Sequence, residues 1–62
     1  MQMIYLVTVI SKFGTEQFWA GADNETEALL MAAKQDHTGD GVSARQVVNE
    51  IGVQKGEWKS AI

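Results

Sequence analysis

The sequence predicts one small α+β domain, in which an N-terminal antiparallel β-hairpin is followed by one long helix and a mostly helical C-terminal segment. Three observations support this fold class. β-Branched and aromatic residues dominate the first ten positions, a glycine-containing turn follows them, and a capped helical pattern begins at Asn24. A chain of 62 residues has room for one core, because a domain of this size buries only about 60% of its unfolded surface. We therefore expect residues 1–62 to form a single domain.

The hairpin is predicted from two apolar segments and the turn between them. Residues 1–10 are largely apolar on both alternating faces, as in a strand that is covered from two sides. Gly14 allows the positive φ that a tight connection often needs. Residues 16–21 then return as a second strand, with Phe18 on one face and Trp19 on the other. One face of this hairpin must meet the domain's own helix, and the other needs a second cover.

The helix is predicted over residues 24–37. Asn24 can accept a hydrogen bond from the amide of Glu27, while the Glu27 side chain reaches back in a capping-box arrangement. Leu29, with two alanines three and four positions further on, forms an apolar stripe at helical spacing. Glycines just beyond position 37 mark the end of the helix.

Residues 43–62 allow two interpretations. As a helix, the segment is capped by Ser43 and stopped by Gly52. Its apolar residues then fall at helical spacing: Ala44, Val47, Val48 and Ile51. As a strand, the segment would place several of these residues on one face, but Gln46 and Glu50 interrupt the alternation. We favour the helix, and a ββαβ arrangement with a third strand is the alternative. Residues 57–62 are short and could form a final helical turn or an edge strand.

Composition indicates where the protein works. Cysteine is absent, so no disulfide or thiolate metal site supplements the core, and stability must come from packing, a partner chain included. The longest apolar stretch, residues 3–10, is much shorter than the roughly 20 residues that a membrane span needs. No basic segment precedes it, so we expect neither a signal peptide nor a membrane partner, and we expect a cytoplasmic location.

No residue pattern indicates catalysis. The chain has a single histidine, no cysteine and no serine in a Gly-x-Ser-x-Gly setting, so a nucleophile and its base are hard to assemble. Asp36, Thr38, Asp40 and Gly41 match the opening of a calcium loop except for the threonine, but Val47 occupies the position of the bidentate glutamate. We therefore expect no enzyme, no metal site and no cofactor.

The charge pattern argues against nucleic-acid binding. Eight acidic and five basic residues give a formal net charge of −3. The basic residues are scattered along the chain, whereas affinity for nucleic acid needs several cations on one face.

Residues 44–62 (ARQVVNEIGVQKGEWKSAI) nevertheless resemble the helix-turn-helix of phage Cro-type repressors. Val47 and Ile51 would lie on the first helix, Gly52 at the turn and Trp58 on the second helix, which in that family enters the major groove. The resemblance implies a set of base-reading and phosphate-contacting residues: Gln54, Lys55, Glu57 and Lys59. A DNA-binding regulator is therefore the alternative function.

The order of strand, loop, strand and capped helix in the first half resembles that of many small phage-encoded proteins, anti-CRISPR inhibitors among them. The resemblance implies stoichiometric inhibition, in which an acidic protein occupies a basic groove on a host protein or protein complex. The carboxylates that would present such a face are Asp23, Glu25, Glu27, Asp36 and Asp40. A solvated acidic face is the alternative interpretation of the same residues.

The aromatic residues indicate a contact surface. Trp19, Trp58, Phe13 and Tyr5 are many large groups for so small a body, and exposed aromatic surface commonly marks an interface. We expect Trp19 to contact a partner, and a homodimer is one way to cover such surface. The alternative is that these aromatic residues simply form the core. The function predicted first is a non-catalytic macromolecular binder, a small phage or mobile-element inhibitor that engages a host protein through acidic residues.

Overall fold

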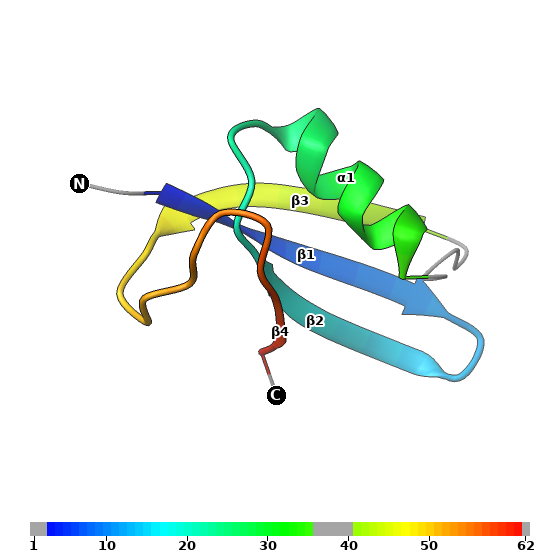
Figure 1. The fold of residues 1–62 in the computed structure, drawn as a ribbon. Helices are drawn as coiled ribbons and strands as arrows, with labels where there is room; N and C mark the ends of the chain where they lie inside the picture. Colours follow the sequence, from blue (N-terminus) through cyan, green and yellow to red (C-terminus); the bar gives the residue numbers. More distant parts are fainter. Residues whose placement is uncertain (1–2, 36–40, 62) are drawn as a thin grey trace.

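The computed structural model describes residues 3–35 and 41–61, which form a four-stranded antiparallel sheet with one helix across it (Figure 1). In chain order the elements are β1 (Met3–Ser11), β2 (Gly14–Ala20), α1 (Glu25–Lys34), β3 (Gly41–Val48) and β4 (Trp58–Ser60). The strands lie in the order β3-β1-β2-β4, so β1 and β2 are central and the two C-terminal strands form the edges.

The expected hairpin is present, and it is tighter than the sequence suggested. β1 and β2 pair without a break from Tyr5 opposite Ala20 to Ser11 opposite Gly14, so only two residues form the turn. Gly14 has a φ of 128°, a conformation that residues with a side chain rarely adopt. The turn is therefore closed by the glycine that predicted it.

The expected long helix is short. α1 has ten residues, Glu25–Lys34, and its C-cap is Gln35. The cap at its start is as predicted, because the Asn24 side chain accepts a hydrogen bond of 2.8 Å from the amide of Glu27. The predicted end at His37 lies outside the described residues.

The helical interpretation of the C-terminal segment is wrong. Residues 41–48 form β3, which pairs with β1 along its whole length, and residues 58–60 form β4, which pairs with β2. The alternatives left open for these residues, a third strand and an edge strand within residues 57–62, come closer, since β3 and β4 lie there. The physical reason is that β1 is central, so its backbone needs a partner strand on each side. Pairing with β1 thus overrides a local spacing that also fits a helix.

The core has two parts, one on each face of the sheet. Beneath α1 lies a buried cluster: Val7, Val9, Phe18, Ala20, Ala22, Ala28 and Ala32. Ile4 and Leu6 alternate with this set along β1 and are buried on the opposite face, which we call the back face. Val53 is only 1% exposed and also lies outside the cluster beneath α1. It belongs to residues 49–57, which connect the two edge strands past the start of β1 (Figure 1). Glu50 and Ile51 of this connection line one pocket with Ile4 and Trp19, so the connection covers part of the back face of the hairpin.

Candidate protein-binding surface

A tight turn organises the connection between β3 and β4. The side-chain amide of Asn49 donates a hydrogen bond of 2.7 Å to the carbonyl of Val53 and accepts one of 3.0 Å from the amide of the same residue. Gly52 within the turn has a φ of 76°. The turn directs two apolar side chains in different ways, since Val53 is buried and Ile51 is 50% exposed.

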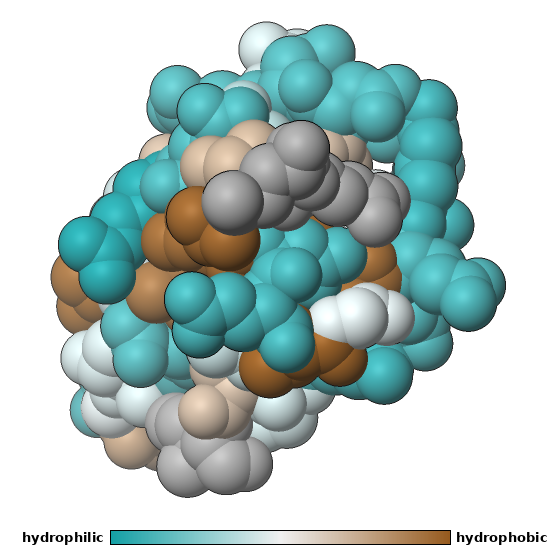
Figure 2. Space-filling view, turned by 90° about the vertical axis from the view of Figure 1, so that its left-hand side faces the viewer, coloured by the Kyte–Doolittle hydropathy of each residue, from teal (hydrophilic) through white to brown (hydrophobic). Residues whose placement is uncertain are grey.

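A groove of about 510 Å³ lies beside this turn. It is lined by residues of β1, β2, β3 and the turn: Ile4, Trp19, Val47, Val48, Glu50 and Ile51. We call it the Trp19 groove. Figure 2 shows the end of the molecule where β3 passes into the turn, with apolar side chains at the surface among hydrophilic ones. Apolar surface framed by polar residues is typical of a contact site for another protein.

Two cations stand in register with Trp19 on the back face. Leu6 of β1 lies opposite Trp19 of β2 and, on its other side, opposite Arg45 of β3. Trp19 lies opposite Lys59 of β4. Directly opposite residues share a face of the sheet, so these four side chains form one row. Strands lie about 4.8 Å apart, so the backbones of Arg45 and Lys59 are roughly 14 Å apart. Trp19 therefore sits between two positive charges.

The two cations differ in their surroundings. The ammonium of Lys59 lies 3.6 Å from a carboxylate oxygen of Glu57, so part of its charge is balanced within the chain. Arg45 is exposed on the edge strand, and no ion pair joins it to another of the described residues. Arg45 is therefore the stronger attraction for an anionic group on a partner.

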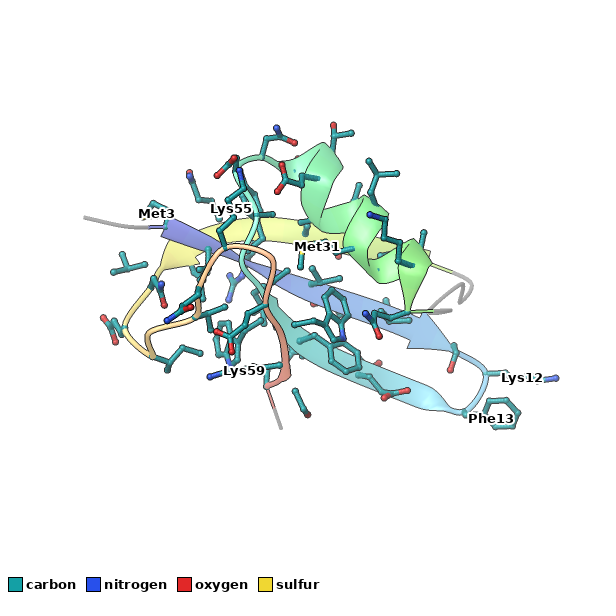
Figure 3. The ribbon with its side chains drawn as sticks, in the orientation of Figure 1. Met3, Lys12, Phe13, Met31, Lys55 and Lys59 are labelled. Carbon is teal, nitrogen blue, oxygen red and sulfur yellow. The ribbon has the colours of Figure 1, made fainter. Side chains whose placement is uncertain are left out.

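The structure gathers three of the five expected acidic residues at the start of α1. Asp23, Glu25 and Glu27 lie there, and Lys55 reaches Asp23 from the connection to form an ion pair (Figure 3). The hydrogen bond from Lys55 to Asp23, the charge of Asp23 and the charge of Glu27 raise the pKa of Lys55 above its usual value. The acidic cluster therefore carries a compensating cation.

The other residues expected to bind a partner are Asp36, Asp40 and Trp19. Asp36 and Asp40 lie outside the described residues. Trp19 is half-buried and lies on the back face, whereas α1 covers the opposite face. Trp19 and the acidic cluster thus belong to two separate surfaces, and a single flat partner cannot cover both.

The helix-turn-helix expectation is wrong. Its proposed first helix falls in β3, and its proposed second helix is split between a turn and β4. The Gln54 amide donates to a carboxylate oxygen of Glu57 at 2.8 Å, and the Glu57 amide donates to the Gln54 carbonyl at 2.9 Å. These bonds close a turn in which Gly56 has a φ of 85°. Lys59 lies beyond it in β4, so the four expected contact residues do not share a helix.

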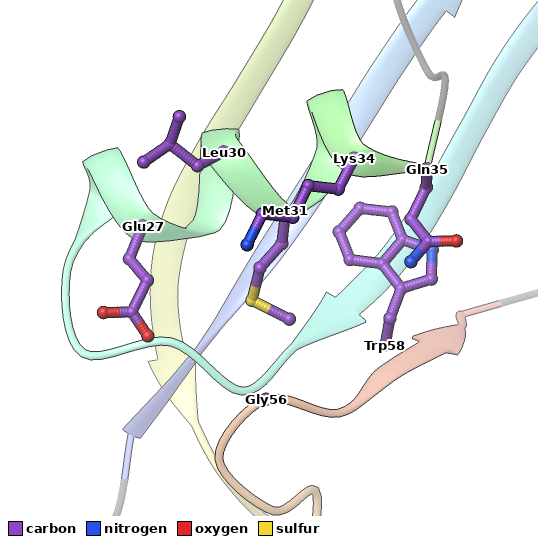
Figure 4. A pocket seen from close by; sticks show the side chains of 7 residues that line it. All are labelled: Glu27, Leu30, Met31, Lys34, Gln35, Gly56 and Trp58. Atoms are coloured by element: carbon purple, nitrogen blue, oxygen red, sulfur yellow. The ribbon is translucent and has the colours of Figure 1, made fainter.

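A second cavity of about 340 Å³ separates α1 from β4 (Figure 4). Met31 and Lys34 line it from the helix, and Trp58 lines it from the sheet. The Trp58 ring stacks on Phe18 with centroids 4.8 Å apart. Trp58 therefore closes the side of the core, in agreement with the alternative that the aromatic residues form the core rather than an interface.

Most of the calcium-loop pattern lies outside the described residues. Asp36, Thr38 and Asp40 lie outside the described residues, while Gly41 and Val47 belong to β3. Within residues 3–35 and 41–61, no three histidine, cysteine, aspartate or glutamate residues are grouped to hold a metal ion. In the same part of the chain, no helix is long and apolar enough to cross a membrane.

Sequence reasoning identified Trp19 but missed the other residues of its groove. Val48 and Ile51 were assigned to the core face of a helix, and only strand pairing brings them beside Ile4 and Trp19. The signal in the sequence was the first strand, which is apolar on both faces and so required a cover on the back face. Comparisons with protein-family models, curated proteins and solved structures found no match to this chain.

Proposed function

We propose that this chain is a non-catalytic protein-binding domain, and that its partner docks in the Trp19 groove. The observation that carries the proposal is the groove itself, where Val48 and Ile51 remain 41% and 50% exposed around a half-buried tryptophan. Interfaces draw most of their binding energy from a few apolar and aromatic anchors surrounded by polar residues.

The flanking charges suggest the chemistry of the partner. Arg45 and Lys59 stand on either side of Trp19 in the same row of the sheet. A partner segment with an apolar side chain between acidic residues would fill the groove and meet both cations. The proposed partner is therefore a protein with an acidic, apolar-centred contact segment.

A second candidate function is stoichiometric inhibition of a host protein, of the phage-encoded anti-CRISPR type, in the cytoplasm, with contact through the acidic cluster at the start of α1 rather than through the Trp19 groove. Two features support it: the sequence resemblance and the clustering of Glu25 with Asp23 and Glu27. The ion pair between Asp23 and Lys55 reduces the net charge of that cluster, which makes Glu25 and Glu27 the better candidates for contact. The cytoplasmic location rests on the cysteine-free sequence.

Affinity purification from the native host, with the wild type and three variants as baits, tests both surfaces. Ile51→Glu places a charge at the rim of the Trp19 groove, and Glu25→Gln removes one from the acidic cluster. Phe13→Glu is the matched control, because Phe13 is an apolar residue 89% exposed in the hairpin turn, far along β1 and β2 from the groove.

The groove proposal expects Ile51→Glu to weaken binding of the purified partner about 30-fold, the loss typical of an interface anchor, while Phe13→Glu changes little. If the partner still binds the Ile51→Glu variant but no longer binds Glu25→Gln, the acidic cluster rather than the groove is the binding surface. A partner retained equally by all three variants would rule out both surfaces. Circular dichroism of each variant shows whether its fold is intact.

A further inference from the structure

From the hydrogen-bond pattern we infer that β3 pairs with β3 of a second copy of the chain, so that two sheets join into one across a two-fold axis at Ala44. This dimer does not depend on the partner proposed for the Trp19 groove, since it uses the backbone of the edge strand rather than the groove.

The direction of each backbone group follows from the bonds at the other edge of the sheet. The Gly21 amide donates to the Glu57 carbonyl at 2.9 Å, and the Ala61 amide donates to the Gln17 carbonyl at 2.9 Å. Odd-numbered residues of β2 therefore direct their backbone toward β4, and even-numbered ones direct it toward β1. Since Phe18 lies opposite Val7, odd-numbered residues of β1 bond to β2 and even-numbered ones bond to β3.

The same alternation continues into the edge strand. Leu6 lies opposite Arg45 and Thr8 opposite Ser43, so the odd-numbered residues of β3 bond to β1. Its even-numbered residues, Val42, Ala44, Gln46 and Val48, then direct their amides and carbonyls away from the sheet, and the Val48 carbonyl already accepts a hydrogen bond of 3.0 Å from the Glu50 amide. Among the residues that the structure describes, no strand lies on that side.

The edge of β3 lacks most of the protection that edge strands usually carry. Natural edges are short, or contain proline, bulges or several charges, because unpaired backbone groups attract other chains. β3 has eight residues, pairs with β1 without a bulge, contains no proline, and carries a single charge at Arg45. Such a strand is suited to pairing with another strand.

Charge excludes one register of the pairing, and the three residues with both backbone groups unpaired favour another. An axis at Arg45 would place this residue directly opposite Arg45 of the second copy, and like charges at such positions are destabilising. An axis at Ala44 instead places Ser43 opposite Arg45 of the second copy, and Val42 opposite Gln46. This register pairs every outward-facing backbone group of Val42, Ala44 and Gln46 without juxtaposing charges.

The helix is compatible with this arrangement. Glu27, Met31 and Lys34 line the cavity that faces Trp58, so they mark the side of α1 nearest β4. Helical periodicity puts Leu29 and Ala33 on the opposite side, above the free edge of β3. Leu29 is half-buried and Ala33 is exposed, so apolar rather than charged side chains would face the second copy.

Sedimentation of the full chain over a range of concentrations tests the dimer. Gln46→Pro removes an outward-facing amide and leaves the ladder to β1 intact, so we expect a folded monomer. Arg45→Pro is the matched control, because it removes an amide that bonds to β1 and should unfold the protein instead. A wild type that stays monomeric up to about 1 mM would overturn the inference.

Ser43 tests the register without touching the core, because it is exposed on the back face. Ser43→Glu creates two ion pairs with Arg45 across an axis at Ala44 and should tighten the dimer about fivefold, whereas Ser43→Arg should weaken it about as much. A dimer that neither Ser43 variant changes, or that survives Gln46→Pro with its fold intact, would overturn this mode of pairing.

Discussion

The side-chain amide of Asn49 holds both backbone groups of Val53, at 2.7 Å for the carbonyl and 3.0 Å for the amide. A single side chain thus satisfies a donor and an acceptor in a turn that has no strand partner of its own. Because Val53 is buried and Ile51 lines the groove, the turn links the stability of the fold to the shape of the candidate site.

Asn49→Ala should lower the free energy of unfolding by about 1–3 kcal/mol, because it leaves the amide and carbonyl of Val53 without their partner. Urea denaturation followed by circular dichroism measures the change. Asn49→Asp keeps the acceptor for the Val53 amide but sets a carboxylate oxygen against the Val53 carbonyl, which repels it, so its loss at neutral pH should be at least as large. An Asn49→Asp variant as stable as the wild type would contradict the bond to the Val53 carbonyl.

Gly21→Ala should be strongly destabilising, by about 3 kcal/mol. A Cβ at this position would lie 1.9 Å from the carbonyl oxygen of Gln54, and that atom belongs to the backbone. The Gly21 amide and carbonyl also bond to Glu57 and Gly56, so moving the chain apart would break the junction of β2 and β4.

Gly41→Ala provides the control for this substitution. No atom lies within 4 Å of a Cβ built at Gly41, so the change should alter the thermal midpoint very little. If Gly21→Ala proved as stable as Gly41→Ala, the close approach of the connection to β2 would be wrong.

Trp58→Ala should lower the free energy of unfolding by about 2 kcal/mol, through loss of the stack on Phe18 and of the cover at the side of the core. Trp58→Phe keeps an aromatic ring and should recover most of the loss. Denaturant titration measures both variants. Equal stability of the alanine and phenylalanine variants would show that the stack contributes nothing.

The sequence predicted the hairpin and the start of the helix because their signals are local. Gly14 supplies the turn, and Asn24 lies three residues before the amide that it caps. The edge strand could not be predicted in the same way, since the spacing of Ala44, Val47, Val48 and Ile51 also fits a helix. Only the pairing with β1 decides between the helix and the strand, and β1 lies about 40 positions away in the sequence.

The candidate site was predictable in part. Trp19 stood out because it alternates with Phe18 and so could not share the core beneath the helix. The row that sets it between Arg45 and Lys59 depends on the registers of three strand pairs. A shift of one residue in any of these registers would move side chains to the other face, and no local pattern in the sequence specifies them.

The ion pair of Lys55 with Asp23 predicts a pH dependence at alkaline pH. Its pKa is raised in the folded protein, first by the hydrogen bond to Asp23, so folding favours the protonated form. The associated stability is fully present below the ordinary lysine value of 10.5 and is lost as the pH rises through the higher value of the folded state. The effect should be small, because both side chains are more than half exposed to water.

Urea midpoints of the wild type and of Lys55→Gln, measured on either side of pH 10.5, isolate this contribution. The other lysines are the same in both proteins, so the difference between them reports on Lys55 alone. We expect the wild type to be the more stable at neutral pH and the two midpoints to converge as the pH rises. The same convergence should follow from added salt at neutral pH, because the pair is exposed and therefore screened. Parallel curves with a constant difference would mean that Lys55 stabilises the connection through packing of its side chain rather than through its charge.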